Sequence, residues 1–204
     1  MKITLKDGSV KEYESATTAA EITKDISMGL YRNACCCRIN GAVKDLRTVV
    51  DSDCEFEVLT FDEEDGKKAF NHTASHVMAQ AVKRLYPDTK LTIGPAIENG
   101  FYYDFDVETP FGPEDLEKIE KEMKKIIKEN YPIEKFELPV DEAIKLMQDK
   151  GEPYKIELIN EHAGKGEAIS FYKQGEFTEL CAGPHIPEMK VIKAFKLTNC
   201  TGAY

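Results

Sequence analysis

Two histidines one helical turn apart are the first residues of this chain that could do chemistry. His72 and His76 lie in the segment NHTASHVMAQAVKRLYP, which occupies positions 71–87. In a helix, residues four apart project from the same edge. Imidazoles on one edge could bind a metal ion, or could position water and carry protons for hydrolysis. A third interpretation is a solvated surface on which neither histidine has a role.

The apolar positions of the same segment favour exposure when the pair is taken alone. They form one stripe about 100° wide, made by Phe70, Ala74, Val77, Met78, Ala81 and Leu85. The histidine edge lies nearly opposite this stripe, so neither histidine is expected in the core. The small side chains of Ala69 and Ala79 on that edge leave room for another segment to pack there.

A second pair of chemistry-bearing residues occurs later in the chain, in ELCAGPHIPE. Cys181 and His185 are four residues apart, and Gly183 and Pro184 between them predict a loop rather than a helix. If this loop faced the histidine edge, imidazoles and a thiol would line one pocket. Zinc accepts such ligands in tetrahedral geometry, and an ester-hydrolysing pocket could use them as acid, base and hydrogen-bond donors. The alternative without function is a rigid turn with a buried cysteine.

Composition and charge limit the classes of protein. The chain has 204 residues, 42% of them hydrophobic and 31% charged, and a net charge of −10. Such a length allows one or two domains. Residues 1–61 carry 8 basic and 10 acidic side chains, and the remainder carry 19 and 27. Neither part resembles a protein that binds nucleic acid indiscriminately by neutralising phosphates. No DNA partner is expected, and an RNA partner would need a local groove or sequence outside this chain.

The sequence carries no pattern typical of a membrane span, a secretory signal or a disulfide framework. No stretch approaches the ~20 apolar residues that a membrane span needs, and MKITLKDGSV lacks the apolar run of a secretory signal. The six cysteines include three in a row, Cys35 to Cys37, and no pair has C-x-x-C spacing. This pattern fits neither a disulfide framework nor a zinc knuckle. We expect reduced thiols in a cytoplasmic protein, with Cys35 to Cys37 filling a buried strand.

Residues 1–61 predict a small, strand-rich domain of the β-grasp type. MKITLKDGSVKEY alternates apolar and polar residues around Asp7-Gly8, which is typical of a hairpin. TAAE at positions 18–21 predicts a capped helix start, with Gly29 as its stop. CCCRINGAV predicts a strand and an Asn40-Gly41 turn, and CEFEVLTF predicts the last strand.

Residues 62–204 predict a second, α+β domain. Asp62 could cap a long helix that ends before Pro87. LTIGPAIENGFYYDFDV predicts a hairpin that turns at Asn99-Gly100, and Gly112-Pro113 opens an amphipathic helix with a charged, solvated face. The strand IEKFELPV, a short helix over residues 141–150 and several further strands complete the domain.

Five motifs, in one order, resemble the N-terminal half of bacterial threonyl-tRNA synthetases. They are HTASH, IGPAIENGFYYDF, EPYKIELI, ELCAGPH and FKLTNCTGAY. The sequence before them resembles the TGS domain, so the resemblance covers essentially the whole chain. H-x-x-x-H followed by C-x-G-P-H is shared with alanyl-type editing domains, in which the four residues bind zinc, whereas the threonyl type works without it. GFYYDF and the TGS-like start favour the threonyl type.

The resemblance implies a fold and an activity. The fold is α+β, with a β-grasp, TGS-like domain over residues 1–61 and an editing domain of the threonyl/alanyl second-additional-domain type over residues 62–204. The activity is that of an aminoacyl-tRNA hydrolase, which removes serine wrongly attached to the 3′-terminal adenosine of tRNA(Thr). No cofactor is implied for this step.

The resemblance also implies what lies outside this chain. ATP, Mg and a catalytic zinc belong to a class II ligase core, for which this sequence has neither a signature nor a Gly-rich phosphate loop. We therefore expect a piece of a longer, cytoplasmic ligase that forms a homodimer through that core. The piece itself should have no ATP-dependent ligase activity and no membrane contact.

The resemblance assigns roles to five catalytic positions. His72 and His76 would position water and substrate, and His185 would transfer a proton or donate a hydrogen bond at the ester. Lys155 matches a pocket lysine that could stabilise the oxyanion or bind the ribose. Cys181 matches a thiol that lines the seryl site.

Two further positions concern substrate binding. Tyr103 matches a tyrosine beside the terminal adenosine, and Glu179 stands where the family often has an aspartate that could hold the seryl ammonium. Ala182 replaces a common arginine, so the contact of that arginine is absent. Taken singly, Lys155 would be a surface charge on a strand, the FYY motif would be core packing, and His162 would be exposed in the polar loop NEHAGKGEA.

Two rival functions stay open. One is a zinc-dependent hydrolase of the alanyl type, with His72, His76, Cys181 and His185 as ligands. The other is a non-catalytic RNA-binding or regulatory module with an inert pocket. Zinc content and the deacylation of seryl-tRNA(Thr) separate the three interpretations.

Overall fold

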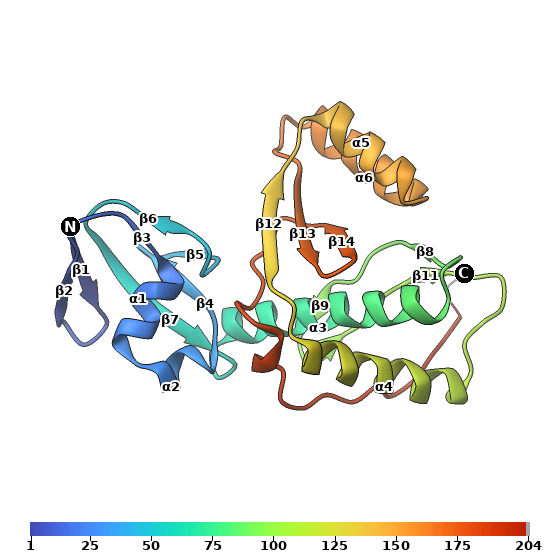
Figure 1. The fold of residues 1–204 in the computed structure, drawn as a ribbon, viewed down its shortest axis with the longest axis horizontal. Helices are drawn as coiled ribbons and strands as arrows, with labels where there is room; N and C mark the ends of the chain where they lie inside the picture. Colours follow the sequence, from blue (N-terminus) through green and yellow to red (C-terminus); the bar gives the residue numbers. More distant parts are fainter. Residues whose placement is uncertain (203–204) are drawn as a thin grey trace. The chain divides into compact units, whose positions relative to one another are not determined.

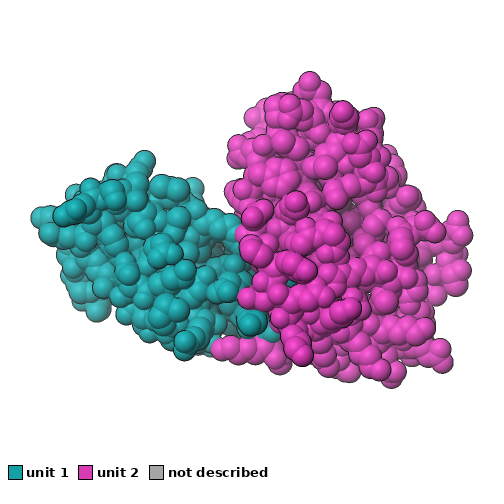
Figure 2. Space-filling view, viewed as in Figure 1, with its two compact units in different colours: residues 1–73, 183–192 teal, residues 74–182, 193–204 magenta. Residues whose placement is uncertain are grey.

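The computed structural model of the chain describes residues 1–202. They form two compact units, coloured separately in Figure 2. The first consists of residues 1–73 with 183–192, and the second of residues 74–182 with the segment from 193 onward. Both units contain helices and strands (Figure 1), which confirms the predicted α+β class. The domain boundary between residues 61 and 62 stays a prediction.

A five-stranded mixed sheet organises the first unit. Its strands lie in the order β2-β1-β7-β4-β5; β1 and β7 are parallel, and the other neighbours are antiparallel. The strands are β1 Lys2–Leu5, β2 Val10–Glu12, β4 Ala34–Ile39, β5 Ala42–Lys44 and β7 Cys54–Thr60. The remaining elements are α1 Ala19–Ile26, α2 Met28–Tyr31 and the paired short strands β3 Thr17–Thr18 and β6 Val49–Val50. This is the β-grasp arrangement that the sequence predicted.

Local signals explain most of these elements. Gly8 closes the first hairpin with a φ of 86°, and Asn40 and Gly41 turn the second with φ values of 51° and 81°. Thr18 caps α1, because its hydroxyl accepts a hydrogen bond from the Glu21 amide at 3.2 Å. Gly29 as the helix stop was wrong: α1 ends at Ile26, and Gly29 lies inside α2.

The three consecutive cysteines are buried as predicted. Cys35, Cys36 and Cys37 lie on β4 with no exposed surface, and Cys37 packs in the core with residues such as Ile3 and Phe56. Burial raises the pKa of each of the three thiols to about 12. They therefore stay protonated and unreactive at neutral pH.

The helix α3, Glu64–Leu85, carries the histidine pair and ends before Pro87 as predicted. Asp62 does not occupy the capping position, because Glu63 directly precedes the first helical residue. The Glu63 carboxylate accepts hydrogen bonds from the Thr60 amide at 2.7 Å and the Thr60 hydroxyl at 2.9 Å.

The predicted apolar stripe does not describe which side chains of α3 are buried. Between residues 69 and 82 the helix is buried on nearly every face, and Thr73, Ser75, His76 and Gln80 are as buried as the apolar positions. A helix enclosed on all sides shows no single apolar face. Exposure of the histidine edge was therefore an incorrect expectation for His76.

The second unit combines two helical layers with short antiparallel strands. Its sheet has the order β12-β13-β14, and two further pairs join β8 with β11 and β9 with β10. The strands are β8 Lys90–Leu91, β9 Ala96–Ile97, β10 Gly100–Phe101, β11 Phe105–Asp106, β12 Ile133–Glu137, β13 Ser170–Gln174 and β14 Phe177–Leu180. The helices are α4 Pro113–Glu129, α5 Val140–Asp149 and α6 Pro153–Gly164. The short helix η1 Met189–Val191 belongs to the first unit.

Some predicted elements of this unit are confirmed and others are not. Gly112 caps α4, and its amide donates to the Asp115 carboxylate at 2.8 Å. The predicted hairpin forms, but Gly100 pairs with Ile97, so its turn lies one residue earlier than expected. None of the helices in the described part of the chain is both long and apolar enough to span a membrane.

The segment after Pro153 is helical, which corrects two expectations. Proline at the first helical position favours a helix start, and α6 runs from Pro153 to Gly164. Lys155 is therefore on a helix and not on a strand. His162 lies in the last turn of that helix rather than in a loop, and its Nδ1 contacts the Glu167 carboxylate.

One close approach fixes the start of α3 against β7. A Cβ added at Gly66 would overlap the backbone carbonyl of Thr60, which cannot move without shifting the strand. Gly66→Ala should therefore lower the free energy of unfolding by about 1–3 kcal/mol, measured by urea denaturation. Gly164→Ala at the end of α6 is the control, since nothing lies within 4 Å of its added Cβ. Equal effects of the two substitutions would contradict this assignment.

An arginine joins three elements of the second unit and makes stability depend on pH. The Arg84 guanidinium on α3 lies 3.2 Å from the Glu122 carboxylate and 2.9 Å from that of Glu129, both on α4, and it also contacts Glu176. Arg84 lowers the pKa of Glu176 to about 2. Because the folded-state pKa is below the unfolded value, this stabilisation is complete above the unfolded pKa and is lost as the pH falls towards about 2.

Glu176→Gln should thus reduce stability at pH 7 by less than about 1 kcal/mol, because the carboxylate is more than half exposed and screened. Urea denaturation should show this difference from wild type shrinking as the pH is lowered towards 2. Glu108→Gln, in an exposed loop, should show no difference at any pH. A Glu176→Gln deficit that stays constant with pH would contradict the assignment.

Candidate active site

The histidine pair projects from one edge of α3, and His76 is deeply buried. Its side chain is 3% exposed, whereas His72 is half-buried. The His76 ring meets the Phe177 ring edge-on at a centroid distance of 6.4 Å. The His72 ring lies against the His185 ring, with centroids 4.5 Å apart and planes inclined by 37°.

The loop that follows β14 carries Cys181 and His185. Its start is tied to β13, because the Cys181 amide donates to the Ser170 carbonyl at 3.0 Å and the Ser170 hydroxyl donates to the Cys181 carbonyl at 2.6 Å. Gly183 has a φ of 76°, a conformation that glycine adopts without strain. His185 and Ile186 are buried, whereas Ala182 in the same loop is exposed.

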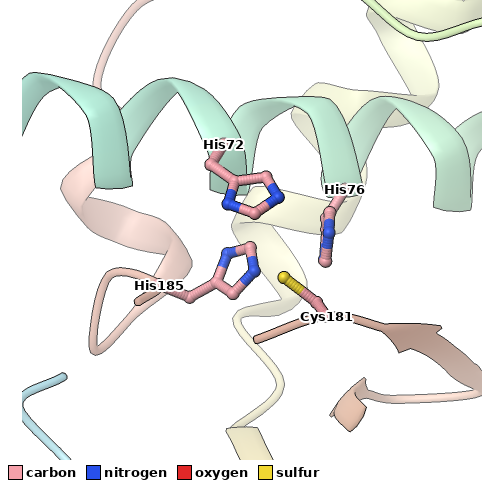
Figure 3. Close-up of side chains that lie close together, drawn as sticks. All are labelled: His72, His76, Cys181 and His185. Atoms are coloured by element: carbon pink, nitrogen blue, oxygen red, sulfur yellow. The ribbon is translucent and has the colours of Figure 1, made fainter. Parts of the chain in front are cut away.

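The structure brings the four residues His72, His76, Cys181 and His185 together. One nitrogen or sulfur atom from each lies within 4.8 Å of those of the others, and Figure 3 shows the three rings and the thiol turned toward one another. The helix fixes the two α3 histidines, and the short loop fixes the other two residues. The catalytic roles of the four stay predictions.

A second cluster, in the second unit, contains Lys155, Glu179 and Tyr103. The Lys155 ammonium lies 2.8 Å from Glu179 Oε1, and the Tyr103 hydroxyl donates to Glu179 Oε2 at 2.6 Å. Lys155 Nζ also donates to the Thr92 carbonyl at 2.6 Å. Lys155 is 4% and Glu179 2% exposed, so Lys155 is not the surface charge that a lone lysine would suggest.

Glu179 Oε1 keeps capacity for a further hydrogen bond. It is buried, and no hydrogen bond of suitable geometry reaches it, although the Lys155 ammonium is close enough for charge pairing. Burial and the negative charge of Glu179 raise the pKa of Tyr103 well above its usual value. The Tyr103 phenol therefore stays protonated and acts as a donor to the carboxylate.

Small residues make room for this second cluster. A Cβ added at Gly94 would overlap the Tyr103 ring, and the Ser75 hydroxyl on α3 donates to the Gly94 carbonyl at 2.7 Å. Thr92, Gly94 and Ser75 support the site, and no sequence motif had predicted a role for them. The glycine within the IGP motif was the one available signal, since only glycine fits under the tyrosine ring.

A cavity of about 590 Å³ borders Tyr103 in the second unit. Aromatic residues, among them Tyr102 and Phe105, form one wall, and the segment from Lys196 to Gly202 forms another. The rings of Tyr103 and Phe105 stack with centroids 4.6 Å apart. Such a cavity has the size and the aromatic lining that suit a nucleoside.

The four-residue cluster fits zinc in the kind of its donors. Cysteine and histidine are typical zinc ligands, and bonds of 2.0–2.3 Å would place tetrahedral donors about 3.3–3.8 Å apart. The widest separation here reaches 4.8 Å, so the cluster would have to contract to hold the ion. His72, His76, Cys181 and His185 would be the ligands.

Comparisons with known proteins agree with these structural features. Residues 1–60 match the TGS domain family. Residues 169–203, which include β13, β14 and the Cys181–His185 loop, match the family described as "Threonyl and Alanyl tRNA synthetase second additional domain". The two matches lie near the two ends of the chain, the first in the β-grasp unit and the second around the Cys181–His185 loop.

Similar whole sequences come from one kind of ligase. The chain is 61% identical over all 204 residues to the threonine–tRNA ligase of Acetivibrio thermocellus, 60% to that of Clostridium perfringens and 53% to that of Clostridioides difficile. It covers 31–32% of these relatives, about a third of their length. Over its whole length the chain is thus similar to about a third of each of these threonine–tRNA ligases.

The buried ion pair gives a prediction that concerns stability alone. Lys155→Met should lower the free energy of unfolding by about 3–5 kcal/mol, because it leaves a buried carboxylate without its cation. The double variant Lys155→Met with Glu179→Gln should recover part of this loss in urea denaturation. Lys173→Met, at an exposed position of β13, should change stability by less than about 0.5 kcal/mol. No recovery in the double variant would show that the pair is not coupled.

Proposed function

We propose that the chain hydrolyses the ester of serine wrongly attached to the 3′-terminal adenosine of tRNA(Thr). The observation that carries this proposal is the buried Glu179 carboxylate, which has an oxygen without a hydrogen bond and lies two residues before Cys181 of the imidazole–thiol cluster. An aminoacyl ester carries an ammonium group next to its carbonyl. In the proposal the Glu179 carboxylate holds this ammonium, and the imidazoles transfer protons.

Discrimination between amino acids explains why such a site is needed. Serine and threonine differ by one methyl group, which gives only about 1–3 kcal/mol of discrimination in a binding pocket. A second pocket that hydrolyses the smaller amino acid and excludes the larger one multiplies the selectivity. The ligase relatives would gain accuracy from this step.

The residues divide the chemistry of ester hydrolysis among them. A water molecule attacks the seryl carbonyl, the ester bond breaks, and the ribose oxygen leaves with a proton. In the proposal His72 and His76 position the water and the substrate, and His185 transfers a proton at the ester. Cys181 lines the seryl pocket rather than acting as a nucleophile.

The second cluster would bind the substrate and stabilise charge. The Lys155 ammonium has three hydrogens and its hydrogen bond to the Thr92 carbonyl takes one of them, so it could also donate to the oxyanion or the ribose. The hydroxyl of Tyr103 is committed to Glu179, so its ring face would contact the terminal adenosine at the neighbouring cavity. Glu179 would hold the seryl ammonium.

We propose that this hydrolysis proceeds without a metal cofactor. The alternative follows from the donor set: bound zinc would polarise the ester carbonyl or activate water. Zinc analysis of protein purified without chelator separates the two. One zinc per chain, with activity lost on chelation, would replace the metal-free proposal by the zinc-dependent one.

A deacylation assay tests the function directly. The 204-residue chain at high concentration should hydrolyse seryl-tRNA(Thr) and leave threonyl-tRNA(Thr) largely intact. His72→Ala, Lys155→Ala and His185→Ala should each lower the rate about a hundredfold or more, because each removes a group acting at the ester. His162→Ala is the matched control, since His162 lies outside the cluster, in the last turn of α6.

Two results would contradict the proposal. Equal hydrolysis of seryl and threonyl substrates would show that the site does not discriminate between the two amino acids. No hydrolysis by the wild-type chain, together with unchanged tRNA binding in His72→Ala, would favour the non-catalytic RNA-binding module.

A further inference from the structure

The loop that bears His185 is held by the β-grasp unit. Residues 183–192 belong to the first compact unit, together with residues 1–73. Two residues of the turn before β6, Asp45 and Arg47, contact the loop about 140 positions away in sequence. The loop itself has no regular structure between β14 and η1, so its backbone is held by contacts with other segments, these among them.

Arg47 binds three consecutive carbonyl groups of the loop. Its guanidinium donates to the carbonyl oxygens of His185 at 3.2 Å, Ile186 at 2.8 Å and Pro187 at 3.3 Å. A planar fork of donors matches such a curved backbone, which a lysine ammonium would not. Arg47 thereby fixes the backbone from His185 to Pro187.

Asp45 completes this arrangement. One carboxylate oxygen accepts from the Arg47 amide at 2.8 Å and from its guanidinium at 2.9 Å, which holds the arginine in place. The other oxygen accepts from the His185 amide at 3.2 Å. Asp45 is buried, so this network is shielded from water and weakly screened.

Thr73 holds the imidazole ring itself. Its hydroxyl donates to the Ala69 carbonyl at 2.8 Å and accepts from the Ile186 amide at 3.1 Å. The hydroxyl oxygen also lies 2.8 Å from His185 Nδ1. A hydroxyl has one hydrogen and two lone pairs, so with its hydrogen directed to the Ala69 carbonyl it accepts from the ring, an arrangement that puts a hydrogen on Nδ1. Nε2 is then the basic nitrogen of the neutral ring.

We propose that the β-grasp unit positions His185 for the hydrolysis: Asp45 and Arg47 fix its backbone, and Thr73 fixes its tautomer with Nε2 as the proton acceptor. The proposal rests on the proposed function, in which His185 acts at the ester. It gives the TGS-like unit a role in catalysis that does not require contact with tRNA. Asp45, Arg47 and Thr73 are positioning residues, because they act through His185.

Arg47→Gln tests the backbone contacts in the full 204-residue chain, with Arg38→Gln as the matched control. Arg38 is also ion-paired, to Glu57 and Asp65, and neither of these partners lies in the loop. Exchange of the His185 and Ile186 amide hydrogens should accelerate about tenfold or more in Arg47→Gln alone. The kcat for seryl-tRNA(Thr) should fall about tenfold with KM changed less than about twofold, because positioning and not binding is lost.

A conservative pair tests the tautomer. Nitrogen-15 NMR of the imidazoles should show the Nδ1–H form of His185 in wild type and in Thr73→Ser, which keeps the hydroxyl. Thr73→Val should shift His185 towards a mixture of tautomers and lower kcat. An Nε2–H ring in the wild-type protein would overturn the tautomer assignment.

The outcomes separate this proposal from the proposed function. If Arg47→Gln matches Arg38→Gln in exchange or in kcat, the positioning role is overturned. If Arg47→Gln does not fold, Arg47→Lys and Asp45→Asn replace it, with smaller expected losses in the same readouts. If the wild-type chain fails to hydrolyse seryl-tRNA(Thr), the proposed function fails, while exchange and tautomer still decide whether the unit holds His185.

Discussion

A carboxylate buried as deeply as that of Glu179 is costly unless it has charged and hydrogen-bonded partners. Lys155 and Tyr103 supply these partners, and each is fixed in turn by its own neighbours, the Thr92 carbonyl and the space left by Gly94. The pairing orders α6, β14 and the β10–β11 segment around one charge. It leaves one carboxylate oxygen with capacity for a hydrogen bond, which is the feature that suits an ammonium-bearing substrate.

The imidazoles of the cluster formed by His72, His76, Cys181 and His185 are held in position in two different ways. Helix geometry alone places His72 beside His76, whereas His185 depends on a loop without regular structure. The β-grasp unit supplies the missing constraint through Arg47, which binds the loop backbone. Catalytic imidazoles must be held in one orientation and one tautomer. In the proposal, the contacts made by Asp45 and Arg47 hold His185 in the orientation that the hydrolysis needs.

Sequence reasoning succeeded where the signal was local. The Thr18 cap and the Asn40-Gly41 turn depend on neighbouring residues only, and both formed as predicted. The prediction of a strand at Lys155 was wrong, because Pro153 begins a helix there. The prediction that His76 is exposed was wrong, because an enclosed helix has no single apolar stripe. Arg47 contacts a loop that is distant in sequence, and no local sequence pattern predicts such a contact. The order of the five motifs suggested that the histidine helix and the Cys181–His185 loop lie close together. The spacing of these residues alone could not have established this.

The central claim is that Glu179 receives the ammonium of a seryl ester beside the imidazole cluster. The most direct measurement is a crystal structure of the chain with a non-hydrolysable analogue, serine joined by an amide to 3′-amino-3′-deoxyadenosine. The account predicts the ammonium at hydrogen-bond distance, about 3 Å, from Glu179 Oε1, with the amide carbonyl facing His185 and Lys155 and the adenosine against Tyr103. An analogue bound away from Glu179, or with its ammonium turned to solvent, would contradict it.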